Sequence, residues 1–309
     1  MNNRFWLSTF LATVLCGGTL QAINVGLTGW PAPKPRLPMP GYEYISATRD
    51  GQTDHSLFYF NLFGFGDRIK AADVLVLGSS HAQFGISAAL LADATSTDSK
   101  NRRGFNAALG GGEGLAFAAL LVERHRSERD LIVFDPFANG RGLSTEAIRT
   151  VALSGVGSAY LGTFKIWSGF IRDWALQGLL PRLTIAAAHK IENPVGSTVV
   201  REWLTADVTA FYSNRGKIFK DQTKGHTIGT GSDWHGERPI LSDLTTIKNA
   251  AARIFVSAIP YPSYSGQIAC EAAAAIHAKF VHISSASVLF WASHHLTQAG
   301  RGRVTNPLL

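Results

Sequence analysis

The chain has 309 residues, of which 46% are hydrophobic and 17% are charged, and its formal net charge is +7. This composition is sufficient for a sizeable apolar core and excludes an intrinsically disordered chain. The basic residues are scattered rather than gathered in a run with aromatic residues, so we expect no nucleic-acid binding. Cys16 and Cys270 are the only cysteines. Because Cys16 falls in the leader described next, we expect no intrachain disulfide.

The first 29 residues form a candidate export leader. Arg4 precedes an apolar stretch that ends in small residues and a candidate cleavage site, Leu20-Gln21-Ala22. The apolar character continues to Leu27, and this length also suits an uncleaved membrane anchor. Signal peptide and anchor stay open as alternatives. Both place the body of the protein outside the cytoplasm of a bacterium, in the periplasm or at the inner membrane.

A proline-rich segment follows the leader. Residues 30–41 contain five prolines, and this density excludes regular structure and predicts a semi-rigid linker. The domain proper is then predicted to span 42–309. Within it, residues 141–242 are first helical in pattern and then polar without a clear period, so we interpret them as an insertion or lid over the core sheet.

Five short segments of the domain are predicted to be strands of one parallel sheet. The first of them is the clearest, because it is an unbroken apolar run that is too short for a helix and rich in β-branched residues. The five segments are Val74–Leu77, Gly104–Asn106, Leu131–Phe134, Arg253–Ile259 and Lys279–Ile283. Helical patterns alternate with them at Gly85–Asp93, Glu113–Arg126, Leu244–Ala252 and Ile268–Ala278. The alternation predicts an α/β fold, a three-layer α/β/α sandwich around a five-stranded parallel sheet.

Ser80 is the leading candidate for a nucleophile. The turn Gly78-Ser79-Ser80 joins the first predicted strand to a helix, which places Ser80 where backbone N–H groups near a helix N-terminus stabilise an anion. The structural alternative is a plain turn in which a serine caps the helix. The loops after the other strands carry Gly110–Gly112, Asn139 and the segment around His295, and such loops gather at one edge of a parallel sheet.

In this order, the blocks resemble those of the SGNH, or GDSL-like, hydrolase superfamily. The matches are Gly78-Ser79-Ser80 for the first block, Asn106 and Gly111 for the second, Asn139 for the third, and His295-Leu296-Thr297 with Gly300 for the last. The resemblance implies a flavodoxin-like SGNH fold and acyl transfer through a serine ester. Ser80 would be the nucleophile and His295 its base, and the oxyanion hole would consist of the N–H groups of Ser80 and Gly111 with the amide of Asn139.

One position departs from the family pattern. Ala292 stands three residues before His295, where the family has its orienting aspartate. In serine-histidine-acid sites, loss of the acid lowers the rate on the order of ten-thousand-fold. Two interpretations stay open. Either a serine-histidine dyad works with another support, such as a backbone carbonyl or the Ser293 hydroxyl, or the chain is a catalytically inactive binding or assembly protein of the cell envelope.

The expected function is that of an exported esterase or O-acyltransferase that acts on acyl, in particular acetyl, esters of a cell-envelope glycan. Family members with an amino-terminal anchor, a Gly-Ser-Ser start and a long insertion include enzymes that modify exported polysaccharides. A membrane-bound acyl donor is a further expected partner, and neither a metal nor a cofactor is expected. A flavodoxin-like nucleotide-binding domain is the poorer interpretation, because no glycine-rich phosphate-binding pattern follows the first strand.

Overall fold

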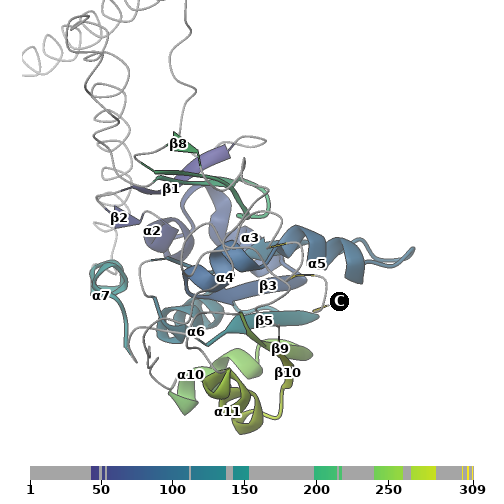
Figure 1. Cartoon of the computed structure of the whole chain (residues 1–309). Coiled ribbons are helices and arrows are strands. Elements are labelled where there is room, and N and C mark those ends of the chain that lie inside the picture. Colours follow the sequence, from purple (N-terminus) through teal and green to yellow (C-terminus); the bar gives the residue numbers. More distant parts are fainter. Residues whose placement is uncertain are drawn as a thin grey trace, which may run out of the picture. The chain divides into compact units, whose positions relative to one another are not determined.

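The computed structural model describes residues 43–48, 51–52, 54–110, 113–136, 142–152, 198–213, 216–217, 240–259 and 266–282, with 301, 305 and 308. The chain divides into two units, Met1–Leu37 with Ile166–Pro194 and Pro38–Lys165 with Val195–Leu309. All described residues belong to the second unit (Figure 1). Within these ranges no helix is long and apolar enough to cross a membrane. The predicted leader and linker lie outside the described residues.

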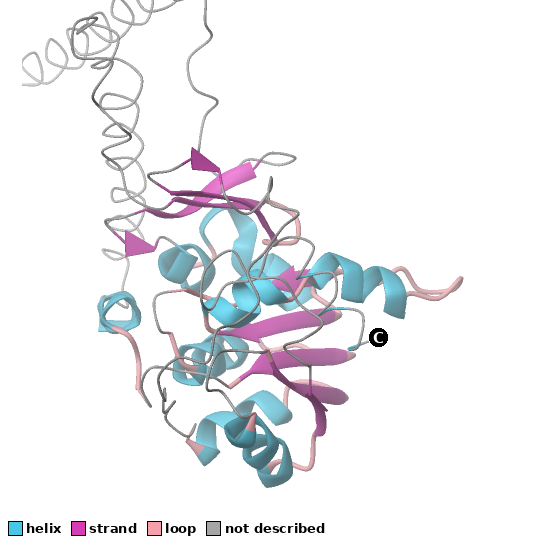
Figure 2. Ribbon diagram, in the orientation of Figure 1, coloured by secondary structure: helices cyan, strands magenta, loops and turns pink. Residues whose placement is uncertain are grey.

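The second unit is built around a five-stranded parallel sheet, and this confirms the predicted fold class (Figure 2). Its strands in spatial order are β4 (Gly104–Asn106), β3 (Val74–Gly78), β5 (Leu131–Asp135), β9 (Arg253–Ala258) and β10 (Lys279–His282). Every neighbouring pair is parallel. β3 and β5 are buried at every residue, which explains why their sequences are unbroken apolar runs.

The strand order reverses between β3 and β5. The chain goes from β3 to its neighbour β4 on one side, then returns to β5 on the other side and continues to β9 and β10. This is the flavodoxin-like order, in which ligands bind at the carboxyl ends of the two strands where the order reverses. Gly78 and Asp135 face each other across that point in the strand register.

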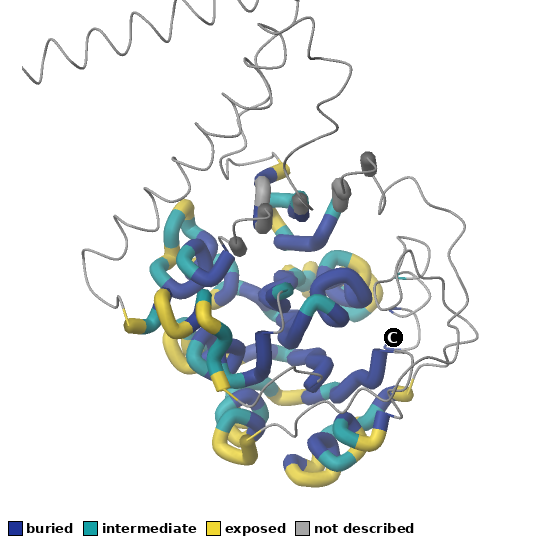
Figure 3. Tube along the Cα trace, turned by 60° about the vertical axis from the view of Figure 1, so that its left-hand side comes forward, coloured by how far each residue is buried: buried dark blue, intermediate teal, exposed yellow. Residues whose placement is uncertain are grey.

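Helices cover the parallel sheet and complete the three layers. They are α4 (Ser80–Gly85), α5 (Ala88–Thr95), α6 (Leu115–Arg124), α10 (Leu241–Lys248) and α11 (Gln267–Ala275). Side chains of α4 and α5 share one buried cluster with alternate residues of β3 and β5. α6 contacts β3 and α10, whereas α11 packs on β9 and β10. Figure 3 shows the buried residues gathered along the sheet and the inner sides of these helices.

The helix predicted at Gly85–Asp93 corresponds to α5, which begins three residues later than predicted, and a separate helix that was not predicted, α4, precedes it. α4 ends at Gly85 and α5 begins at Ala88. The break is stabilised by a cap at the start of α5, where the Asp207 carboxylate accepts hydrogen bonds from the N–H groups of Ala88 and Ala89 at 3.0 and 3.1 Å. This cap comes from a residue more than a hundred positions away, so the local pattern does not reveal it.

A second, antiparallel sheet was not predicted. Its spatial order is β2 (Gly51–Gln52), β1 (Glu43–Thr48), β6 (Thr198–Glu202), β7 (Val208–Ser213) and β8 (Gly216–Lys217). The last three strands, like α7 (Thr145–Ala152), belong to the segment that we interpreted as an insertion or lid. The remaining described elements are α2 (Asp54–Tyr59), η1 (Leu62–Gly64) and α3 (Phe65–Ala71).

The buried guanidinium of Arg201 joins β6 to the edge of the parallel sheet. Arg201 is 0% exposed, and it donates to the backbone carbonyls of Asn106 at 2.8 Å and Ala108 at 2.5 Å. These carbonyls lie on the side of β4 and of the residues after it that faces away from β3, where the N–H of Asn106 also donates to the Thr205 carbonyl at 2.7 Å. The guanidinium thus binds backbone groups that a further strand would otherwise bind. The Asp54 carboxylate, 2.9 Å from Nε and equally buried, compensates the charge.

We predict that Arg201→Met lowers the free energy of unfolding by about 3–5 kcal/mol, because the substitution leaves the Asp54 carboxylate buried without its cation. Urea denaturation followed by circular dichroism measures the change. Arg126→Met is the control, since Arg126 is exposed and, among the described residues, forms an ion pair with the exposed Glu123 alone. The control is expected to leave stability almost unchanged. Equal stability of the two variants would contradict the role assigned to Arg201.

Candidate active site

The turn after β3 places Ser80 at the point where the strand order reverses. Gly78 has a φ of +125°, a conformation that side chains other than glycine rarely adopt. A Cβ atom at this position would also lie 2.6 Å from the backbone oxygen of Asp135. The glycine therefore allows the close approach of the turn to β5. Ser80 follows as the first residue of α4 and is half-buried.

The two serines of the turn have different roles. Ser79 is the N-cap of α4, and its hydroxyl accepts a hydrogen bond from the backbone N–H of His81 at 3.4 Å. Ser79 is also buried, at 2% exposure. The structural alternative, in which a serine caps the helix, is therefore satisfied by Ser79. Ser80 is not used for capping, and the nucleophile prediction stays with it.

The segment after β4 lies along the serine turn. The N–H of Ala107 donates to the Val76 carbonyl at 2.8 Å, and the N–H of Leu109 donates to the Gly78 carbonyl at 2.9 Å. These bonds continue the parallel pairing with β3 beyond the end of β4. Gly110, bonded to Leu109, is therefore next to the turn. Gly111, the predicted oxyanion donor, lies outside the described residues.

Asn106 holds the carboxyl end of α4 against β4. It is fully buried, and its side-chain amide donates to the backbone carbonyl of Ile86 at 3.0 Å. Its Oδ1 accepts from the N–H of Ala108 at 3.2 Å, which also fixes the start of the following loop. The residue matched to the second family block thus positions the helix that begins with Ser80.

Asp135 closes the end of β5 beside the serine turn. It is 0% exposed, and its Oδ2 accepts a hydrogen bond from the N–H of Ile259 at 3.3 Å. The carboxylate thus connects β5 to the chain just after β9. Asn139, Ala292 and His295 lie outside the described residues, so their predicted roles stay predictions.

Glu113 forms a buried polar cluster with His55 and Ser144. It was predicted at the start of a helix, and α6 begins two residues later, at Leu115. Glu113 is 1% exposed and His55 is 2% exposed. The Glu113 Oε2 lies 2.5 Å from His55 Nε2 and accepts from the Ser144 hydroxyl, also at 2.5 Å. The cluster joins α2 to the residues just before α6 and α7.

Two residues that support this region, Arg201 and Asp207, were not predicted from the sequence. Charged residues usually lie in water, so the residue types alone do not indicate that either side chain is buried. A signal exists for Arg201, because alternate residues of a strand share a face and Arg201 alternates with the apolar Val199. Both residues are buried in the structure, at 0% and 4% exposure. The sequence around Asp207 gives no comparable signal, because its role depends on hydrogen bonds to Ser87 and to the first residues of α5.

Among the described residues, no group of three or more His, Cys, Asp or Glu side chains is placed to hold a metal ion.

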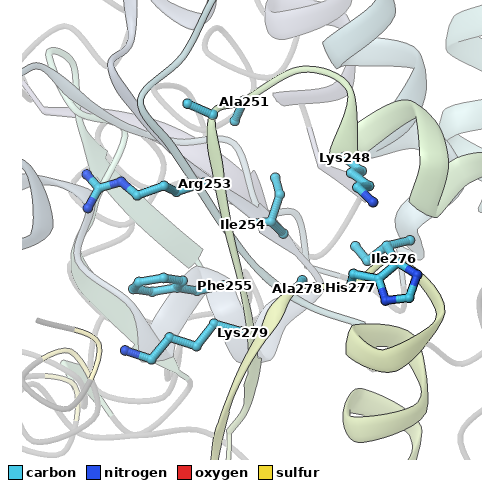
Figure 4. A pocket seen from close by; sticks show the side chains of 10 residues that line it. Lys248, Ala251, Arg253, Ile254, Phe255, Ile276, His277, Ala278 and Lys279 are labelled. Atoms are coloured by element: carbon cyan, nitrogen blue, oxygen red, sulfur yellow. The ribbon is translucent and has the colours of Figure 1, made fainter.

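A hollow of about 290 Å³ lies at the amino-terminal ends of β9 and β10, whereas Ser80 follows the carboxyl end of β3. Figure 4 shows Lys248 and His277 on one side of β9 and Arg253 and Lys279 on the other, so these basic side chains do not converge. The hollow has no carboxylate, hydroxyl or thiol among its lining side chains, so we do not interpret it as a candidate active site.

We predict that Gly78→Ala lowers the free energy of unfolding by about 2–3 kcal/mol, since a Cβ atom would meet the backbone of Asp135 in a conformation disfavoured for alanine. Gly142→Ala is the control, because a Cβ atom there would have no neighbour within 4 Å. Chemical denaturation of both variants measures the difference. If Gly78→Ala were as stable as Gly142→Ala, the turn would not require glycine.

Comparison with protein-family models, with curated proteins and with solved structures finds no significant match. The resemblance to the SGNH superfamily therefore rests on the residues of this sequence alone.

Proposed function

We propose that the chain is an exported serine esterase or O-acyltransferase in which Ser80 is the nucleophile and His295 is its base. The observation that supports it best is the position of Ser80. This serine begins a helix directly after β3, at the carboxyl end of the strand and beside β5, where the strand order reverses. Open α/β sheets bind their ligands at this place, and Ser79 leaves Ser80 free of the capping role.

The proposed reaction is acyl transfer in two steps. His295 takes the proton of the Ser80 hydroxyl while the oxygen attacks the carbonyl carbon of an acyl ester. The tetrahedral intermediate then expels the alcohol, which receives the proton from His295, and an acyl-serine remains. In the second step, water or a glycan hydroxyl gives a proton to His295 and attacks the acyl-serine. His295 then returns this proton to the oxygen of Ser80 as it leaves, which restores the free serine. Water yields a free acid, whereas a glycan hydroxyl yields a new ester.

The proposed oxyanion hole combines the N–H groups of Ser80 and Gly111 with the side-chain amide of Asn139. Its support is the path of the preceding chain, since Leu109 is bound to Gly78 and Gly111 follows two residues later. Removal of one such donor costs about 100- to 1,000-fold in kcat. Three such donors would stabilise the oxyanion of the transition state enough for the site to retain activity even though Ala292 replaces the family's aspartate.

The proposed substrate is an acyl, in particular acetyl, ester of a cell-envelope glycan, with a membrane-bound acyl donor as partner if the reaction is transfer. This part of the proposal depends on the predicted leader and on the family resemblance.

The alternative function is that of a catalytically inactive binding or assembly protein of the cell envelope. Ala292, which stands at the place of the family's aspartate, favours this alternative.

We predict that a fluorophosphonate forms a single adduct on Ser80, because an activated serine attacks the phosphorus centre. Intact-mass spectrometry of the protein measures the adduct. Ser80→Ala is expected to abolish it, and His295→Ala is expected to slow its formation. Ser79→Ala is the matched control, since it removes the neighbouring hydroxyl and the helix cap only, and it is expected to form the adduct. If the folded wild-type protein forms no adduct, the proposal that the chain is a serine enzyme is wrong.

We further predict that Ala292→Asp raises esterase activity on a chromogenic acetyl ester, because a carboxylate three residues before His295 would orient the imidazole. A rise of about 10-fold or more in kcat with little change in KM is expected for an otherwise intact site. Ala292→Asn, which has the same size without the charge, is the control. No gain from aspartate over asparagine would mean that another group already supports His295 or that the site is inactive.

A further inference from the structure

Asp207 joins the end of the helix that carries Ser80 to the helix that follows it. The residue stands directly before β7, in the segment that we interpreted as an insertion or lid. We propose that Asp207 is a positioning residue for Ser80, and that the insertion is thereby part of the site rather than a separable cover. The inference rests on the proposed function, because Ser80 is its nucleophile, and it adds a residue to which that function gives no role.

The Asp207 carboxylate binds the first residues of α5 and the residue before them. Its Oδ1 accepts from the N–H of Ala88 at 3.0 Å. Its Oδ2 accepts from the Ser87 hydroxyl at 2.8 Å and from the N–H of Ala89 at 3.1 Å. Asp207 is 4% exposed, and Nη2 of Arg301 lies 3.8 Å from Oδ2. Because hydrogen bonds to a charged acceptor are strong, this buried carboxylate fixes the start of α5.

The same carboxylate is also connected to the end of α4. Asn106 Nδ2 donates to Oδ1 of Asp207 at 3.3 Å. It also donates to the carbonyl oxygens of Ile86 and Gln83, at 3.0 and 3.4 Å. Gln83 belongs to the last turn of α4 and Ile86 follows the helix, so the amide binds carbonyls that a helix end leaves open. A cap of α5 alone would not need this contact, so Asp207 holds both helices.

Ser80 lies at the other end of this short helix. α4 has six residues, so it is about 9 Å long. Its last hydrogen bond runs from the N–H of Ile86 to the Ala82 carbonyl at 3.0 Å. A helix of this length is not stable alone, and its position depends on the contacts at its ends. We therefore expect a shift at the end held through Asp207 to move Ser80 as well.

Loss of Asp207 is expected to slow the reaction of Ser80 without changing how tightly the ligand binds. The hydroxyl and the backbone N–H of Ser80 are both proposed to act in the transition state, and α4 carries both. Misplacement of a catalytic group by about 1 Å can cost about 100-fold in rate. Interactions made only in the transition state affect kcat rather than KM, so the two constants should separate.

The test compares Asp207→Ala, Asp207→Asn and Arg129→Met with the wild type. Arg129 is the matched control, because it is also a buried charged residue, at 2% exposure, and it binds the backbone carbonyls of Ile69 and His125. It stands before β5, at the amino-terminal end of that strand, whereas Ser80 follows the carboxyl end of β3. Its loss is therefore expected to lower stability without slowing the reaction.

Two measurements are made on each variant. Reaction with a fluorophosphonate at several concentrations separates the maximal rate of adduct formation from the affinity. Hydrogen exchange of the peptides covering 79–86 and 87–95 is followed by mass spectrometry. The first peptide reports on α4 and the second on α5, so exchange distinguishes a link between the two helices from a cap of α5 alone.

We expect Asp207→Ala to lower the maximal rate about 10- to 100-fold, with unchanged affinity, and to speed exchange in both peptides. Asp207→Asn should recover most of the rate, because its amide oxygen can accept from the N–H of Ala88 and its NH₂ can donate to the Ser87 oxygen. Arg129→Met should react like the wild type. A wild-type rate in folded Asp207→Ala, or an equal loss of rate in Arg129→Met, would overturn the inference.

If the wild type forms no adduct at all, the proposed function fails, and hydrogen exchange then decides on the positioning of α4. Faster exchange of the peptide 79–86 in Asp207→Ala than in Arg129→Met would support it. Equal exchange of that peptide in the two variants would overturn it, because Asp207 would then be at most a cap of α5.

Discussion

The surroundings of Ser80 depend on one buried guanidinium. Arg201 binds carbonyls on the side of β4 and of the residues after it that faces away from β3, while the opposite side of the same segment is bonded to β3 through Ala107 and Leu109. A buried charge costs several kcal/mol unless a partner and hydrogen bonds compensate it, and Asp54 and the carbonyls do so here. The antiparallel sheet is therefore joined to the outer strand of the parallel sheet. Through Arg201 it fixes the chain that leads to the proposed oxyanion loop.

Polar contacts that are distant in sequence fix the helices around the turn. Ser79 caps the start of α4, Asn106 binds the chain at its end, and Asp207 caps α5. Each side chain satisfies backbone groups that the turn and the short helices leave open. These helices are too short to be stable alone, so their positions depend on such contacts and on packing. Ser80, the proposed nucleophile, begins the first of these helices, so the same contacts fix its backbone.

The parallel sheet could be predicted from the sequence because its central strands are buried on both faces and appear as short apolar runs. Val74–Gly78 and Leu131–Asp135 are clear examples. The antiparallel strands β1 and β6 could not be found in this way, because they lie some 150 residues apart and their pairing depends on tertiary contacts. The same holds for Arg201 and Glu113, whose charges are buried through partners far along the chain. The position of Ser80 could be predicted because a glycine turn between a strand and a helix is a local signal, whereas its role as a nucleophile stays a prediction.

The most direct measurement of the central claim is a crystal structure of the protein after reaction with a fluorophosphonate. The account predicts phosphorus bonded to Oγ of Ser80, with the phosphoryl oxygen within hydrogen-bond distance of the backbone N–H groups of Ser80 and Gly111. His295 would lie within hydrogen-bond reach of the Ser80 oxygen. Phosphorus on another residue, or a phosphoryl oxygen directed away from both N–H groups, would contradict the account.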